Sequence, residues 1–162
     1  MCLREVAIYD HEAFLVDQNL LLLEGVERFM LTKVYMKEFE IHTTPLEQIK
    51  MNPYCIEIDL DDIMEERYRI IVKPYVAFKI VTSDCVHYGE FSNDYVFRDG
   101  RLHRHILEIE DSEWIHDLRT DITDAHSSFL QNVRHYVLLL QDNVIEIVAE
   151  SLSIEKIPQE KK

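Results

Sequence analysis

The segment RYRIIVKPYVAFKIVT, residues 67–82, carries the clearest structural signal in the chain. It is dense in β-branched and aromatic residues, which favour the pleated, half-buried surface of a sheet. Pro74 interrupts the run, and because proline has no amide hydrogen it cannot donate to a sheet ladder. The segment therefore predicts strands on both sides of Pro74, where the chain lies at a sheet edge, forms a bulge or bends between two strands.

Two segments nearer the N-terminus also have a strand pattern. CIEIDL, residues 55–60, places Ile56, Ile58 and Leu60 on one face and acidic residues on the other, which is typical of a half-buried strand. RFMLTKVYMKEFEIHTT, residues 28–44, alternates apolar and polar side chains with β-rich chemistry, which favours a strand over a helix.

The last strong signal is RHYVLLLQDNVIEIVAE, residues 134–150. Its two apolar runs stand on either side of Asp142 and Asn143, and both residue types tolerate the positive φ of a tight turn. We therefore expect the chain to close with a hairpin.

One segment has the spacing of an amphipathic helix. SEWIHDLRTDI, which begins at Ser112, places Trp114, Leu118 and Ile122 four residues apart, so that they lie on one face of a helix. Asp111 or Ser112 can cap its first turn by accepting a backbone amide hydrogen.

Together these segments predict an α+β fold that is predominantly antiparallel β, a barrel-like or sandwich sheet with one or two helices. The order is antiparallel because the strand connections are too short for helical crossovers. The length predicts a single globular domain over residues 1–157, with a loose tail over residues 158–162.

The charge balance restricts the classes of partner. Acidic residues outnumber basic residues 31 to 17, which gives a formal net charge of -14. Such a field repels phosphate backbones and anionic lipid, so we expect no nucleic acid and no membrane partner. A basic protein partner fits this charge, although an acidic balance also serves solubility alone.

The cysteines and the N-terminus point to a cytoplasmic chain. The three cysteines have no paired spacing, and MCLREVAIYDHEAF lacks the basic start and apolar stretch of a signal peptide. The apolar run at residues 20–23 is far shorter than the roughly 20 residues that cross a bilayer.

The histidine pair in RDGRLHRH, residues 98–105, is a candidate metal site. Asp99 and Gly100 predict a two-residue hairpin turn, which pairs Asp94 with His105 and places both on one sheet face with His103. Two imidazoles and a carboxylate are plausible ligands for a divalent metal. The neighbouring arginines disfavour a cation, so we expect His103 and His105 to lie outward on a solvated face.

Cys85 and His87 form a second candidate pair. Two residues apart on a strand, they would share a face at about 6.5 Å, where an imidazole can favour a thiolate. No third orienting group is identifiable, and a small buried hydrophobe is the commoner role of such a cysteine.

Carboxylates crowd two stretches, residues 57–66 and 108–124. They could present a negative surface to a basic partner, or they could form an ordinary solvated face. The calcium-loop pattern is absent, and Asp62 with Glu65 could instead form a capping box. The residues we expect to contact a partner are Asp59, Asp61, Asp62, Asp111, Glu113 and Asp117.

The sequence contains no glycine-rich phosphate loop, serine-hydrolase elbow, HExxH helix or paired cysteines for zinc, and we expect no cofactor. The leading hypothesis is a non-enzymatic protein-interaction module, for example of inhibitor or immunity type. The alternative is a small enzyme or a metal- or ligand-binding protein that uses His103, His105 and Asp94, or Cys85 and His87. Pairing of exposed strand edges into a homodimer is a third hypothesis.

Residues 134–150, together with the strand at YRIIVKPYVAFKI, are similar to the C-terminal end of small bacterial proteins of unknown function. The resemblance implies a bacterial cytoplasmic origin, carries no catalytic residues over and names no family.

Overall fold

The computed structural model describes residues 31–45, 47–86, 91, 96–121 and 129–158. Each pair of neighbouring strands in its sheets is antiparallel. The five-stranded sheet has the order β1 (Thr32–Val34), β8 (Ile106–Ile109), β9 (Arg134–Leu139), β10 (Asn143–Ala149), β5 (Tyr75–Thr82). The four-stranded sheet has the order β11 (Leu152–Lys156), β4 (Arg67–Val72), β3 (Cys55–Asp61), β2 (Gln48–Asn52). The other described elements are a small hairpin of β6 (Phe97–Arg98) and β7 (Arg101–Leu102), the short 3-10 helix η2 (Ser83–Cys85) and the helix α1 (Glu113–Asp121).

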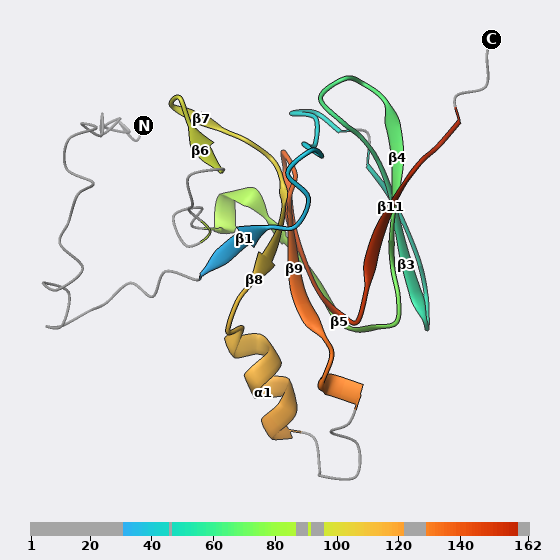
Figure 1. Cartoon of the computed structure of the whole chain (residues 1–162), viewed down its shortest axis with the longest axis vertical. Coiled ribbons are helices and arrows are strands. Elements are labelled where there is room, and N and C mark those ends of the chain that lie inside the picture. The colour runs from blue at the N-terminus through green and yellow to red at the C-terminus, as the bar shows by residue number, and fades with distance from the viewer. Residues whose placement is uncertain (1–30, 46, 87–90, 92–95, 122–128, 159–162) are drawn as a thin grey trace, which may run out of the picture.

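The two main sheets pack as a sandwich and do not close into a barrel (Figure 1). The predicted α+β class is therefore confirmed in its sandwich form. Within the described ranges, no helix combines the length and the hydropathy needed to span a membrane.

The chain passes between the sheets at two neighbouring corners. At Pro74, which follows a cis peptide bond, the chain leaves β4 of the four-stranded sheet and enters β5 of the five-stranded sheet. Between β10 and β11 the chain passes back from the five-stranded sheet to the four-stranded sheet. The corners are hydrogen-bonded to each other, since Lys73 N–H donates to the Ser151 carbonyl and Glu150 N–H donates to the Pro74 carbonyl, both at 3.1 Å. The predicted bend at Pro74 is confirmed, and it is the point where the chain changes sheets.

The main core lies between the sheets. Ile56, Ile58 and Leu60 of β3 are fully buried, as their alternation predicted. They belong to one cluster with Leu138 of β9 and Ile147 of β10 from the facing sheet. Burying each such side chain contributes about 1.5–3 kcal/mol, which makes this interface the main source of stability.

The far face of the five-stranded sheet carries two smaller clusters. Helix α1 covers one of them, where Ile115 packs with Leu130, Val133 and Val148. The second contains Leu107, Ile109, Val137, Leu139 and Val144 with Phe91 and Val96. Strands β9 and β10 are thus buried on both faces, which explains their continuous apolar runs.

The predicted helix and both predicted hairpin turns are present. Ser112 caps α1, because its Oγ accepts the Ile115 amide hydrogen at 3.2 Å. β9 and β10 pair across the predicted turn. In the smaller hairpin Asp99 and Gly100 have positive φ, and Arg98 pairs with Arg101 as the turn requires.

The strand predicted over residues 28–44 is wrong for most of its described part. Only Thr32–Val34 forms a strand. A turn follows, in which Phe39 N–H donates to the Met36 carbonyl at 3.3 Å, and Phe39 packs into the main core. Ile41 retains a single bridge, to Asp62. The packing of Phe39 between the sheets outweighs the apolar–polar alternation of this segment, which alone would favour a continuous strand.

Candidate functional site

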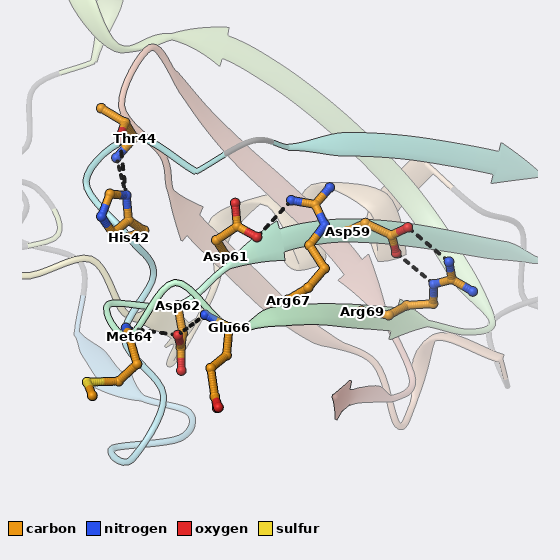
Figure 2. Close-up of polar contacts among 9 residues, drawn as sticks. All are labelled: His42, Thr44, Asp59, Asp61, Asp62, Met64, Glu66, Arg67 and Arg69. Atoms are coloured by element: carbon orange, nitrogen blue, oxygen red, sulfur yellow. Dashed lines mark hydrogen bonds and ion pairs between the residues drawn. The ribbon is translucent and has the colours of Figure 1, made fainter. Parts of the chain in front are cut away.

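The acidic run 57–66 lies on β3 and on the turn that joins β3 to β4, where arginines of β4 meet it (Figure 2). Asp59 stands opposite Arg69 across the two strands. Arg69 Nε lies 2.6 Å from Asp59 Oδ1, and Arg69 Nη2 lies 2.9 Å from Oδ2. The hydrogen bonds from Arg69 hold the pKa of Asp59 below its usual range. Asp59 is buried, and its negative charge is paired with Arg69 of the same sheet.

The next two acids also have internal partners. Asp61 Oδ1 accepts a hydrogen bond from Arg67 Nη1 at 3.0 Å. Asp62 is buried, and its Oδ1 accepts the amide hydrogens of Met64 and Glu66, each at 2.9 Å (Figure 2). Asp62 therefore caps the turn between two strands, and not a helical turn as one sequence interpretation had it. Contact of these acids with a partner stays a prediction, and their described contacts hold β3 to β4.

The other three predicted contact residues lie at the start of α1, well apart from the four-stranded sheet (Figure 1). Asp111, Glu113 and Asp117 are all exposed. Asp111 and Glu113 line a hollow of about 580 Å³, which we call the α1 hollow, whereas Asp117 is not among its lining residues. Its lining comprises residues 108–113, Ile115, His116, Arg119, Val133 and Arg134.

Two residues that line the α1 hollow, Glu108 and Arg134, form an ion cluster with Lys33. Glu108 is buried, and its carboxylate lies 3.0 Å from Lys33 Nζ and 3.4 Å from Arg134 Nη1. Glu110, nearer the rim, lies 3.6 Å from the same Lys33. Of the arginines that line the hollow, Arg134 is thus engaged with Glu108, and Arg119 Nη2 donates to the Leu130 carbonyl at 2.9 Å, while Asp111 stays exposed.

Behind the α1 hollow runs a buried polar chain that the sequence reasoning missed. Ser112 Oγ lies 2.9 Å from His135 Nδ1, and His135 Nε2 lies 3.0 Å from Glu146 Oε2. Lys79 Nζ contacts the same carboxylate oxygen at 2.9 Å. The three buried members are 8%, 3% and 7% exposed in this order. A signal existed, because His135 and Glu146 are polar residues within the two long apolar runs that form β9 and β10.

Trp114 holds this chain in place from α1. Its ring meets the His135 imidazole edge to face at 5.2 Å, and Lys79 Nζ lies 4.7 Å from the Trp114 ring centroid. Burial acts to raise the pKa of Glu146, but the hydrogen bonds from His135 and Lys79 outweigh it and lower that pKa below the ordinary value. Glu146 is therefore a buried carboxylate kept in its charged form.

The histidines of residues 98–105 do not form the predicted outward pair. His105 is buried, and its Nδ1–H donates to the Phe39 carbonyl at 2.9 Å. His103 Nδ1 lies 2.8 Å from Glu40 Oε1. The prediction fails because β7 ends at Leu102, so the alternation of faces does not continue to His105. Asp94 lies outside the described residues.

Cys85 is not on a strand. It is exposed, and it ends the short 3-10 helix Ser83–Cys85, where Thr82 Oγ1 donates to its sulfur at 3.3 Å. Its predicted partner His87 lies outside the described residues. Among the residues that the structure describes, no group of three or more His, Cys, Asp and Glu side chains is arranged to hold a metal ion.

No protein-family model matches the chain, and no curated protein or solved structure matches it.

Proposed function

We propose that the chain is an interaction module that binds a basic protein partner through the acidic rim of the α1 hollow. By the acidic rim we mean Asp111 and Glu113, which line the hollow, together with Asp117 further along α1. All three are exposed, and the exposure of Asp111 and Glu113 at a concave surface is the observation that supports the proposal. An inhibitor or immunity-type protein that masks a basic surface is one concrete form of this function.

The rim carries charge that the helix itself does not need. Glu113 lies in the first turn, where the helix dipole favours an acid. Asp117 lies one turn further on, where that benefit has faded and where like charges four residues apart repel by a few tenths of a kcal/mol. The backbone at Asp111 has a φ of 52°, a conformation that residues other than glycine seldom adopt and that carries a small energetic cost. A role in steering a cationic surface accounts for these small costs.

The β3 face is a weaker candidate for the same role. Its acids are matched by Arg67 and Arg69 of the next strand and, at 4.0 Å from Asp59, by Lys50 of β2. A face on which positive and negative side chains alternate at contact distance attracts a basic surface less than a group of exposed acids does. In this proposal Asp59, Asp61 and Asp62 stabilise the four-stranded sheet, and the acidic residues at α1 contact the partner.

The test compares two variants of equal charge. The site variant carries Asp111→Lys, Glu113→Lys and Asp117→Lys, and the control carries lysines at the exposed acids Glu38, Glu47 and Asp142. Each tagged protein is incubated with lysate and washed at low and then physiological salt. We expect one protein to be captured stoichiometrically by the wild type and the control and lost from the site variant. An empty eluate, or equal capture by both variants, would contradict the proposal.

A further inference from the structure

The buried chain behind the α1 hollow has the connectivity of a nucleophile, a base and an orienting acid. Ser112 lines the hollow, and its Oγ is 2.9 Å from His135. The far nitrogen of the same imidazole is 3.0 Å from Glu146. Both distances lie within the reach that proton transfer and orientation require.

The acid at the far end of the chain fixes the proton on one imidazole nitrogen of His135. The Glu146 carboxylate can only accept, so His135 carries a proton on Nε2 and donates it to Glu146. In the neutral imidazole Nδ1 is then an acceptor, and the Ser112 hydroxyl donates to it. A lone pair of Ser112 Oγ accepts the amide hydrogen of Ile115. This tautomer leaves His135 ready to take the serine proton.

Helix capping does not account for the whole arrangement. Any Ser, Thr, Asp or Asn at position 112 would cap α1, without a histidine behind it. Burying an imidazole and a carboxylate costs more than burying apolar residues of similar volume, even when the pair is well bonded. Lys79 and Trp114 add further contacts that fix the imidazole and keep Glu146 charged.

We propose that Ser112 is a nucleophile for acyl transfer, with His135 as its general base and Glu146 as the positioning residue. In the first step Ser112 Oγ bonds to the carbonyl carbon of an ester and its proton passes to His135 Nδ1. The bond to the leaving oxygen breaks, and that oxygen takes the proton as the alcohol departs. Water then attacks the acyl-serine through the same base, releasing the acid and restoring the Ser112 hydroxyl.

The lining of the α1 hollow restricts the substrate class. Charged side chains of both signs, among them Glu110, Arg119 and Arg134, stand around Ser112. Such a surface suits a small polar acyl ester and disfavours a long hydrocarbon chain. This activity is independent of the proposed interaction, because it needs no partner and depends on Ser112, which the rim substitutions leave in place.

A fluorophosphonate probe tests the proposal on the intact chain. Its phosphorus would bond to Ser112 Oγ, fluoride would leave, and the serine proton would pass to His135. Mass spectrometry of the labelled wild type should find the adduct on Ser112. The exposed-serine control Ser153→Ala should label equally, and His135→Gln should label at least about a hundredfold more slowly.

A further variant separates catalysis from capping. Ser112→Asn keeps a good N-cap but has no hydroxyl, and its adduct should disappear while its circular dichroism matches the wild type. An adduct absent from Ser112 in the wild type, or a folded His135→Gln variant that labels at the wild-type rate, would each overturn the proposal.

Discussion

Arg69 binds both carboxylate oxygens of Asp59 across β3 and β4, at 2.6 and 2.9 Å (Figure 2). The two residues stand directly opposite each other in the sheet register. This relationship turns an apparent acidic patch into a charge-matched surface, since Asp61 and Arg67 repeat it at the next pair on this face. Exposed acids that could meet a partner are therefore sought at α1, where Asp111, Glu113 and Asp117 lie.

The first prediction concerns the stability that this ion pair provides. Asp59→Ala leaves a half-buried Arg69 without its bidentate partner, and we expect the free energy of unfolding to fall by about 1–3 kcal/mol. Urea denaturation measures the change. Glu47→Ala, at an exposed acid beside β2, is the matched control and should stay within about 0.5 kcal/mol of the wild type. Equal effects of the two substitutions would mean that the pair does not stabilise the sheet.

The cap of α1 gives a second prediction. Ser112→Ala removes the acceptor for the Ile115 amide hydrogen, and we expect a loss of about 1 kcal/mol. Ser112→Asn restores an acceptor and should recover part of that loss. Thermal unfolding followed by circular dichroism compares the three proteins, and an alanine variant as stable as the wild type would contradict the capping role.

Glu146 gives a pH-dependent prediction. Its pKa is lowered in the folded chain, so its charged form stabilises the fold above the ordinary carboxyl range of about 4.3. That contribution is lost as the pH falls toward the lower folded-state pKa. Glu146→Gln cannot titrate, so its deficit relative to the wild type should shrink between pH 7 and pH 3. Unfolding curves over this range measure the deficit, and a constant value would refute the linkage.

A fourth prediction tests the core between the sheets. Ile58→Ala opens a cavity at a fully buried position and should cost about 2–5 kcal/mol. Ile80→Ala, on β5 where the side chain is 48% exposed, should cost less than about 1 kcal/mol. Similar losses at both positions would contradict the assignment of the core.

The sequence predicted those elements whose signal is local. The alternation around Ile58 gave a strand face, Pro74 gave a bend, and Ser112 gave a helix cap, because each depends on neighbours within a few residues. His105 was misplaced because its burial depends on the chain at Phe39, which is distant in sequence. No local pattern encodes such a contact.

The candidate sites were harder to predict for the same reason. Pairing of Asp59 with Arg69 depends on the register of two strands, which a run of acids does not reveal. The contact of His135 with Glu146 could have been found by extending the predicted closing hairpin beyond its turn, since the two residues lie diagonally across it. The approach of Ser112 from α1 adds a third element, and only the tertiary fold supplies it.

The central claim is that the α1 rim, and not the β3 face, recognises a basic partner. The most direct test is the association rate of the captured partner with the wild type, the Asp111, Glu113 and Asp117 lysine variant, and the Glu38, Glu47 and Asp142 lysine control, at low and physiological salt. We expect association of the wild type and the control to be fast and to slow strongly with salt, and the rim variant to associate slowly at both salt concentrations. Equal rates for the rim variant and the control would show that the rim does not guide the partner, and would contradict the account.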